Sequence, residues 1–394
     1  MKKIKMMMAA ALGVLVSCGS VKSGEEAIAA SRESKVVVAY VTSWSEVMPD
    51  PQYMTHINYA FGHVNESFNG VKIDNEERLR QIVDLRKQKP ELKVLLSIGG
   101  WGSGRFSEMA ANDEYRRAFA ADCDRVVKEF ALDGIDIDWE YPTSSMANIS
   151  SSPDDTENFT LLMQDIRAAI GNEKELTLAT VASARYIDFK AILPSVDFVN
   201  IMAYDMASAP KHHSALYPSG HSGDITSDGA VTAHLKAGVP PSKLVMGMPF
   251  YGRGGDGYPS FQDYNKVGNT DTQYTEKWDE VAQVPYLADK NDTLVFGFEN
   301  PRSLAIKCQY ILDKDLLGGM YWDYSGDNEQ GDLRRTVAEN LLGKPHKAKV
   351  LVLTERGGQH GGFTDAGLRW LAAEGAKGNF SITEINNARN ITAV

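Results

Sequence analysis

The chain has 394 residues, of which 43% are hydrophobic, and it carries a formal net charge of −11 at pH 7. This length and composition suit a globular protein with one large domain and a smaller additional segment. Basic residues cluster only at Lys2, Lys3 and Lys5, so nucleic acid and anionic membrane surfaces are excluded as partners of the folded part. Neutral or cationic ligands are favoured instead.

The N-terminus has the pattern of an export signal. Three lysines precede a short apolar stretch at residues 6–16, which is too short to span a bilayer as a mature helix. The following Leu-Val-Ser-Cys sequence resembles the bacterial lipoprotein signal, which implies lipid attachment at Cys18. We therefore expect residues 1–18 to be a lipoprotein-type signal and residues 19–34 a linker. The expected location is the bacterial cell envelope or surface, with a secreted protein as the alternative.

Eight short apolar runs alternate with longer amphipathic segments after the linker. The runs predict strands at residues 36–41, 56–61, 93–98, 134–139, 176–181, 198–203, 244–250 and 319–324. Helices are predicted at residues 74–89, 113–132, 153–170, 301–312 and 334–342, with Ser152 as the N-cap of the third. This order and size indicate a (β/α)8 barrel over residues 35–345, an α/β fold. A doubly wound open sheet is the alternative, although no Gly-rich phosphate loop follows the first strand.

Residues 133–140 read DGIDIDWE and place several carboxylates in a strand-like stretch. Side chains alternate along a strand, so Asp136, Asp138 and Glu140 are expected on one face and apolar residues on the other. A row of carboxylates with an apolar back predicts an acidic cavity, since unpaired buried charge is costly. Catalysis, cation binding and an inert edge strand all fit this spacing. Asp133 is out of step and is expected to be structural.

Aromatic and polar residues gather where the other predicted strands end. Because active residues of such barrels lie at the C-terminal ends of the strands, these residues are expected at one mouth. Several aromatics around an acidic strand are typical of a surface on which sugar rings stack. The residues concerned are Tyr40, Trp44, Phe61, Gly100, Trp101, Tyr141, Met202, Tyr204, Asp205, Tyr251, Arg253 and Trp322.

Two long connections follow the sixth and seventh predicted strands. Residues 206–229 contain His212, His213 and His221 but no Cys or carboxylate at ligand spacing, so we expect no metal site there. Residues 254–300 contain a possible hairpin, at 284–287 and 293–297, and are interpreted as a small insertion beside the groove. No cofactor is expected. Cys123 and Cys308 are expected to be buried free thiols.

Residues 346–394 read as a strand, a Gly-rich loop, a helix and a second strand. One βαβ unit cannot bury a core of its own. The stretch resembles the opening of a ThuA-like (trehalose utilisation) domain that is cut short. We therefore expect a partial α/β segment or a tail.

Five motifs in order resemble glycoside hydrolase family 18, the chitinase family. They are the acidic strand, Ser97-Ile-Gly-Gly, Met202-Ala-Tyr-Asp, Phe250-Tyr-Gly-Arg and Trp322. The resemblance implies hydrolysis of β-1,4 bonds between N-acetylglucosamine units by a retaining mechanism, with the acetamido group of the substrate as nucleophile. It implies that Glu140 is the acid and base, and that Asp138, Asp136 and Tyr204 also belong to the catalytic set. The residues named at the strand ends would bind substrate.

Alternatives remain at this point. An endo-β-N-acetylglucosaminidase acting on the chitobiose core of N-glycans shares the acidic strand, and a chitin-binding lectin shares the barrel. The expected partner is chitin or another oligosaccharide that contains N-acetylglucosamine. The membrane is expected to be contacted only through the lipid anchor, and the protein to be a monomer.

Overall fold

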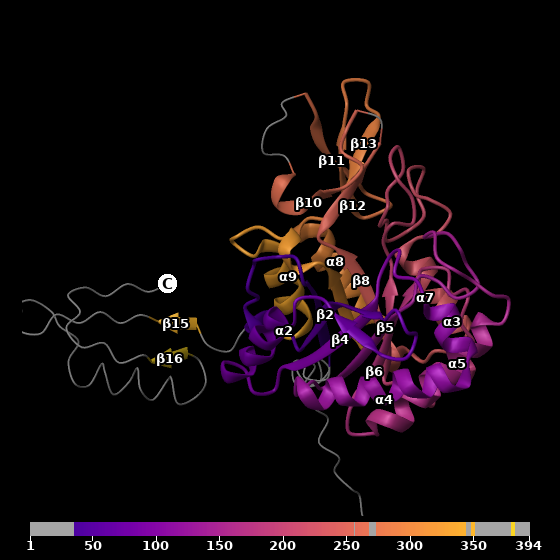
Figure 1. Ribbon diagram of the computed structural model, residues 1–394. Coiled ribbons are helices and arrows are strands. Elements are labelled where there is room, and N and C mark those ends of the chain that lie inside the picture. Colours follow the sequence, from indigo (N-terminus) through magenta and orange to yellow (C-terminus); the bar gives the residue numbers. More distant parts are fainter. Residues whose placement is uncertain (1–34, 256, 268–272, 344–347, 351–379, 383–394) are drawn as a thin grey trace, which may run out of the picture.

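The computed structural model describes residues 35–255, 257–267, 273–343, 348–350 and 380–382. Its main body is a closed parallel barrel wrapped by helices (Figure 1). The barrel strands are β1 (Val36–Thr42), β2 (His56–Val64), β4 (Lys93–Gly99), β5 (Gly134–Asp138), β6 (Glu175–Val181), β7 (Phe198–Met202), β8 (Leu244–Pro249) and β14 (Gly318–Trp322). The eight predicted strands are thus confirmed to within three residues at each end.

The barrel closes because β1 pairs in parallel with both β14 and β2. The strand order is β1-β14-β8-β7-β6-β5-β4-β2, and β3 (Val71–Ile73) adds an antiparallel edge to β2. Closure removes free sheet edges and excludes the doubly wound open sheet. The mouth of the barrel is formed by the C-terminal strand ends, which is where sites lie in this architecture.

Side-chain alternation on β5 follows the expected pattern. Ile135 and Ile137 are fully buried in the large core between strands and helices. Trp139 stacks on Phe106 with ring centroids 5.3 Å apart. Asp136 is also inaccessible to solvent, but it faces the barrel interior and polar partners. The strand therefore separates an apolar face toward the helices from an acidic face toward the barrel axis.

Helices cover the outside of the barrel in Figure 1. Several of their N-termini carry side-chain caps: Asn112 accepts from two backbone amides, and Asn300 forms a capping box with Ser303. The helices are α2 (Glu76–Val83), α3 (Phe106–Ala111), α4 (Asp113–Glu129), α5 (Asp155–Ile170), α6 (Phe189–Ile192), α7 (Ser227–Lys236), α8 (Pro301–Asp313) and α9 (Asp332–Leu341).

All five predicted helices are present, but their ends differ from the prediction and other helices were missed. The predicted segment at 74–89 is shorter, because α2 ends at Val83 and continues as the 3-10 turn Asp84–Lys87. The N-cap of α5 is Asp154 rather than Ser152. Three helices, α3, α6 and α7, were not predicted.

The expected insertion is larger than one hairpin. It is a five-stranded antiparallel sheet in the order β10-β9-β13-β12-β11, and it projects from one end of the barrel (Figure 1). Its strands are β9 (Tyr251–Gly254), β10 (Gln262–Asp263), β11 (Thr275–Asp279), β12 (Val284–Ala288) and β13 (Leu294–Gly297). Since β9 follows β8 almost directly, the insertion begins at the mouth of the barrel.

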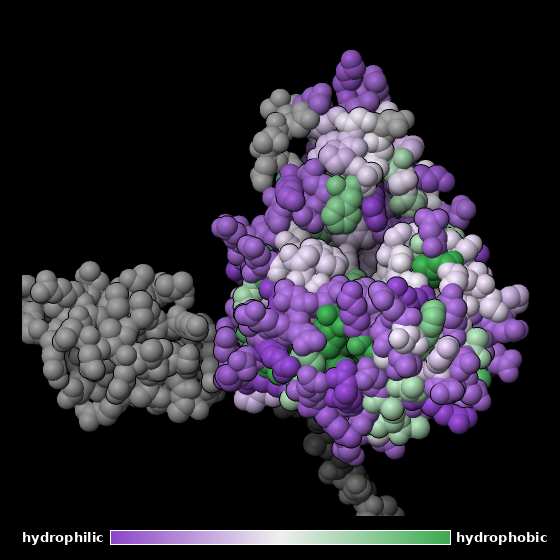
Figure 2. All heavy atoms as spheres, in the orientation of Figure 1, coloured by the Kyte–Doolittle hydropathy of each residue, from purple (hydrophilic) through white to green (hydrophobic). Residues whose placement is uncertain are grey.

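The face of the molecule drawn in Figure 2 is mainly hydrophilic and carries a few separate hydrophobic patches.

Cys123 and Cys308 are buried free thiols, as expected. No helix among the described residues is long and apolar enough to cross a membrane.

Little of the C-terminal segment belongs to the described part of the chain. There β15 (Ala348–Val350) and β16 (Phe380–Ile382) pair in parallel, as two strands of a βαβ unit would. The predicted helix between them, and the predicted signal and linker at residues 1–34, lie outside the described residues.

Candidate active site

A cleft of about 750 Å³ opens at the C-terminal mouth of the barrel. It combines two carboxyl groups of the acidic stretch with aromatic rings from other strand ends. Most residues selected from the sequence line it: Tyr40, Trp44, Phe61, Trp101, Asp138, Glu140, Tyr141, Met202, Tyr204, Asp205, Tyr251, Arg253 and Trp322. This size and mixture suit a ligand of a few sugar rings.

Asp136 lies beneath the cleft, where it accepts four hydrogen bonds. One carboxylate oxygen accepts from the hydroxyls of Tyr40 and Ser97, each at 2.9 Å. The other accepts from Thr177 Oγ1 at 2.5 Å and Asn200 Nδ2 at 3.3 Å. Burial raises the pKa of Asp136, and these four donors lower it. Asp136 is therefore a buried carboxyl group that four hydrogen bonds hold in place inside the barrel.

Asp138 occupies the next inward position of β5 and is 4% exposed. Its Oδ1 is buried and has no hydrogen-bond partner within the described part of the chain. Burial, together with the charges of Glu140 and Asp136, raises its pKa well above the usual value. Burying an unpaired carboxylate costs free energy, so the protonated form of Asp138 is favoured. The unpartnered Oδ1 is available to accept a hydrogen bond from an N–H or O–H group of a ligand.

Glu140 follows the end of β5 and reaches the cleft wall. Burial raises the pKa of its carboxyl group to about 7, a hydrogen bond with Tyr141 lowers it, and the charge of Asp205 raises it. A carboxylic acid with a pKa near neutrality can hold its proton until it is needed and accept one back. This is the protonation behaviour of a general acid and base.

Tyr204 extends from the end of β7 into the same cleft. Its ring lies 6.0 Å from that of Tyr251, and its hydroxyl lies 3.9 Å from Met320 Sδ. Burial and the neighbouring carboxylates raise its pKa well above the usual value, with Asp138 the largest of the charge effects. The phenol therefore remains protonated and can donate a hydrogen bond to a ligand.

Asp205, unlike the protonated Tyr204, is held in its ionised form. The guanidinium of Arg253 donates to both of its oxygens at 2.7 and 2.6 Å, and His213 Nδ1 lies 3.5 Å away. Although burial raises its pKa, the hydrogen bonds and charges of Arg253 and His213 hold it well below the usual range. Asp205 does not share the strand alternation of Met202 and Tyr204, and its φ of 53° provides the bend that lets it line the cleft with them.

Four aromatic rings form one wall and the floor of the cleft. Phe61 stacks on Trp322 with centroids 5.5 Å apart, Tyr40 lies 5.6 Å from Trp322, and Trp44 lies 6.4 Å from it. Trp44 is 64% exposed although it is large and apolar. An exposed ring beside buried ones leaves a face on which a sugar can stack.

A second group of aromatic rings also lines the cleft. Trp101 is 61% exposed and packs against Tyr141 with centroids 6.4 Å apart. Tyr141 in turn stacks on Tyr186 at 5.5 Å. Gly100, which precedes Trp101, packs closely on Phe61, because a Cβ at this position would lie 2.6 Å from the Phe61 ring. Gly100 thus lies behind Phe61 and does not line the cleft.

Some cleft residues were not predicted from the sequence. Tyr186 lies in the loop after β6, and Phe261 lies in the insertion, where it stacks on Tyr251 at 4.7 Å. Met146, Arg185 and Ile225 also line the cleft from loops. Only strand ends could be located from periodicity, so loop residues gave no comparable signal.

The remaining carboxylate, Asp133, is structural, as expected. It precedes β5, pairs with Arg86 and accepts a hydrogen bond from the Val94 amide at 2.7 Å. Among the described residues, no group of three His, Cys, Asp or Glu side chains suited to a metal ion includes a carboxylate of the acidic strand. The sequence alternative of a cation site on this strand therefore has no geometric support.

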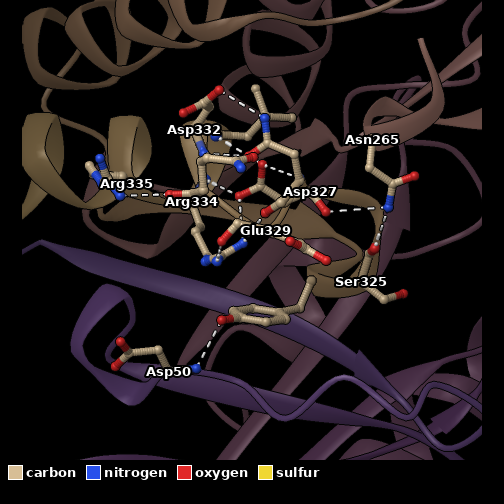
Figure 3. A network of polar contacts seen from close by, with 12 residues as sticks. Asp50, Asn265, Ser325, Asp327, Glu329, Asp332, Arg334 and Arg335 are labelled. Atoms are coloured by element: carbon tan, nitrogen blue, oxygen red, sulfur yellow. Dashed lines mark hydrogen bonds and ion pairs between the residues drawn. The ribbon is translucent and has the colours of Figure 1, made fainter. Parts of the chain in front are cut away.

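A larger hollow, of about 980 Å³, lies beside the connection from β14 to α9. Asp327 there accepts from the amides of Leu333 and Arg334, while Asn265 Nδ2 donates to two backbone carbonyls of the connection (Figure 3). None of the carboxyl groups of β5 lines this hollow. This hydrogen-bond network fixes the segment that follows Trp322. The cleft of about 750 Å³ at the barrel mouth therefore remains the candidate site.

Residues 36–327 match the family model described as glycosyl hydrolases family 18. Chitinase A1 from Niallia circulans is 29% identical over 413 residues, covering 78% of this chain and 58% of that protein. Chitotriosidase-1 from Mus musculus is 31% identical over 350 residues, covering 75% of this chain and 74% of that protein. The chain thus spans little more than half the length of the first relative and about three quarters of the second.

Solved structures agree with this assignment. A family 18 N-acetylglucosaminidase from Paenibacillus barengoltzii superposes with a TM-score of 0.72 and 32% identity, covering 78% of this chain and all of that one. Chitinase ChiA74 from Bacillus thuringiensis has a TM-score of 0.72 and 26% identity, covering 79% of this chain and 70% of that one.

The family match ends at residue 327, so the resemblance of residues 346–394 to a ThuA-like domain gains no support. Over the barrel, the order of motifs, the closed fold and the family match agree. The chain therefore belongs to glycoside hydrolase family 18 and is a chitinase-like member of it.

Proposed function

We propose that the protein hydrolyses β-1,4 bonds between N-acetylglucosamine units, with retention and with the acetamido group of the substrate as nucleophile. The observation that carries this proposal is the contrast between Glu140, whose pKa is about 7, and Asp205, whose pKa is held well below its usual range in the same cleft. Only one of these two groups can act as a proton donor near neutral pH.

In this proposal Glu140 protonates the oxygen of the scissile bond. The side chain then accepts a proton from the water that completes the reaction. Family 18 enzymes are a recognised exception to the use of a second carboxylate as nucleophile. The burial of Asp138 and Asp136 fits this scheme, because neither is presented as an ionised nucleophile at the cleft surface.

Asp138 and Tyr204 are proposed to bind the acetamido group. Asp138 Oδ1 lacks a partner among the described residues, so it can accept the N–H of the acetamide. The Tyr204 phenol stays protonated and can donate to the acetamide carbonyl. Binding both ends of the amide would hold its oxygen near the anomeric carbon and stabilise positive charge on the cyclic intermediate.

The aromatic walls are proposed to hold the rings on either side of the scissile bond. Trp322 forms the floor with Tyr40 and Phe61, and the exposed Trp101 offers a separate face. Sugar rings present apolar faces and polar edges, so stacking can be combined with hydrogen bonds from Asp205 and Arg253. Two separate groups of aromatic rings in one cleft favour an oligosaccharide over a single sugar.

The substrate can be tested by a parallel digest of chitohexaose and a high-mannose glycoprotein. We expect shortened N-acetylglucosamine oligomers from the first and an unchanged glycoprotein from the second. Release of glycan from the protein alone would instead assign an endo-β-N-acetylglucosaminidase. Binding of chitohexaose without any cleavage would assign a lectin and contradict the proposed reaction.

Export and anchoring are proposed from the N-terminal sequence alone. The lysines, the short apolar stretch and the Leu-Val-Ser-Cys sequence support lipid attachment at Cys18 and a position at the cell envelope. Metabolic labelling with radioactive palmitate should mark the wild-type protein and not the Cys18→Ala variant. Equal labelling of both proteins would exclude Cys18 as the site of lipid attachment. Export of the wild-type protein without any label would indicate that it is secreted and not anchored.

A further inference from the structure

His212, His221 and Asp279 meet at a place that the proposed reaction does not use. Each offers one ligand atom, and these atoms all lie within 4.8 Å of one another. We expected no metal site in this connection, because it offers no Cys or carboxylate at ligand spacing to the histidines. The missing carboxylate comes from β11 of the insertion, 58 residues after His221.

The two histidines are held side by side by the backbone of the connection between β7 and α7. The amide of His212 donates to the carbonyl of His221 at 2.7 Å, and His212 forms an isolated bridge with Ser222. Their ring centroids lie 6.1 Å apart, and both rings contact the edge or face of Tyr286 at 5.4 and 5.9 Å. His212 is 2% exposed and His221 lies at the surface.

The carboxylate of Asp279 is oriented before any ion arrives. Its Oδ1 accepts from the amides of Val281 and Ala282, both at 2.9 Å. Its Oδ2 points toward the histidines, 3.2 Å from His212 Nε2 and 2.8 Å from the Ser219 hydroxyl. Hydrogen bonds that fix a carboxylate in this way are the usual support of a metal ligand.

The donor set selects the class of ion. Two imidazoles and one carboxylate suit Zn²⁺ and similar transition metals, whereas Ca²⁺ and Mg²⁺ prefer oxygen ligands throughout. With Zn–N near 2.0–2.1 Å, two ligands of a tetrahedral ion lie about 3.3 Å apart. The 3.2 Å between His212 Nε2 and Asp279 Oδ2 already matches this spacing.

We propose that His212, His221 and Asp279 bind a divalent transition-metal ion, with Zn²⁺ preferred and water as a fourth ligand. The exposed His221 closes onto the prearranged pair. The ion joins the connection between β7 and α7 to the insertion sheet. His213, in the same connection, contacts the Asp205 carboxylate at 3.5 Å. An ion that holds this connection in place therefore stabilises a wall of the cleft. The ion takes no part in bond cleavage.

The test is calorimetric titration of the metal-stripped full chain with ZnCl2, for the wild type and for His221→Ala and Asp279→Asn. His221 is at the surface, and Asn is nearly isosteric with Asp, so both variants should fold. His63→Ala is the matched control, because His63 Nε2 lies 3.1 Å from Asp74 Oδ2 in a pair that belongs to no three-ligand group among the described residues.

We expect one zinc ion per wild-type chain and at least about tenfold weaker binding in His221→Ala and Asp279→Asn. His63→Ala should bind as the wild type does, and zinc should raise the melting temperature only of the wild type and this control. The proposal is overturned if the wild type shows no saturable binding, or if the two ligand variants bind zinc as well as the wild type. Equal loss in His63→Ala would also overturn it.

Discussion

Four carboxylates lie within eight residues of the chain, and each meets a different environment. Asp133 pairs with Arg86, and Asp136 accepts four hydrogen bonds. Asp138 is buried with one oxygen unpartnered among the described residues, and Glu140 titrates near neutrality in the cleft. The environments, and not the residue type, separate the structural and supporting carboxylates from Glu140, for which we propose the catalytic role.

The raised pKa of Glu140 sets the expected pH dependence of hydrolysis. The acid must be protonated to donate, so the rate should fall as pH rises through about 7. Initial rates on chitohexaose between pH 5 and 9 would measure this limb. A rate that stays constant from pH 6 to 9 would contradict the assignment of Glu140 as proton donor.

The same shift predicts how stability changes with pH. The folded-state pKa of Glu140 is raised from 4.5 to about 7, so the folded state binds this proton more tightly than the unfolded state. Its contribution is therefore full below pH 4.5 and is lost as pH rises to about 7. Urea unfolding of Glu140→Gln should show a weaker decline over this window than the wild type, whereas identical profiles would argue against the shift.

Asp205 should tune Glu140 through its charge. The Asp205 carboxylate raises the pKa of Glu140, so Asp205→Asn should move the alkaline limb of the rate profile downward, by about one unit or less. The profile, and not the rate alone, is the informative measurement, since Asp205 also lines the cleft. A limb that stays in place, or moves upward, would show that this charge does not act on Glu140.

At the scale of elements, the insertion contributes to the cleft as well as flanking it. Phe261 precedes β10, is 42% exposed, and stacks on Tyr251 at the start of β9. The Arg253 guanidinium lies 5.3 Å from the Phe261 ring. The antiparallel sheet thus carries an aromatic face to the end of the parallel barrel.

Removing this ring should weaken binding more than chemistry. An aromatic contact of this kind is worth about 0.5–1.5 kcal/mol, so Phe261→Ala should raise KM for chitohexaose roughly two- to tenfold with little change in kcat. The surface residue Val281, which is 58% exposed, offers a matched control as Val281→Ala. A pure fall in kcat, or an equal effect in the control, would show that Phe261 does not hold substrate.

Sequence patterns were sufficient for the barrel strands because each is a short apolar run between longer amphipathic or polar segments. It was insufficient for α7, where Gly229 and β-branched residues interrupt an otherwise weak helical pattern; the structure shows Thr226 as its N-cap. The insertion was underestimated because β9 and β10 are only four and two residues long. Tyr186 reaches the cleft from a loop, where no periodicity exists to locate it.

Placement of the metal ligands illustrates a different limit of the sequence. His212 and His221 lie nine residues apart, but Asp279 joins them only through tertiary structure. Asp136 could be placed on the inward face by alternation, yet its four donors come from four other strands. Contacts between distant segments carry no local signature in one sequence.

At the scale of the molecule, a buried ion pair connects the insertion to the barrel. Lys307 of α8 pairs with Glu299, and neither side chain is exposed. Lys307 Nζ also donates to the Ser214 carbonyl at 2.5 Å, while the Ser214 hydroxyl donates to Glu299 at 2.6 Å. Three segments that surround the cleft thus meet at this pair.

Breaking the pair from one side should destabilise the whole domain. Lys307→Met leaves Glu299 buried without its cation, which typically costs about 3–5 kcal/mol. The double variant Lys307→Met, Glu299→Gln removes both charges and should recover much of this loss. Urea unfolding measures both. A double variant that is less stable than the single one would show that the pair does more than neutralise its own charge.

The central claim is that Glu140 supplies the proton in hydrolysis of N-acetylglucosamine oligomers. The most direct measurement compares kcat/KM of the wild type and Glu140→Gln on chitohexaose, with thermal unfolding recorded for both. We predict a loss of at least about 100-fold for the variant, the usual size of a general acid and base contribution, with folding retained. A folded Glu140→Gln variant that cleaves chitohexaose at the wild-type rate would contradict the claim.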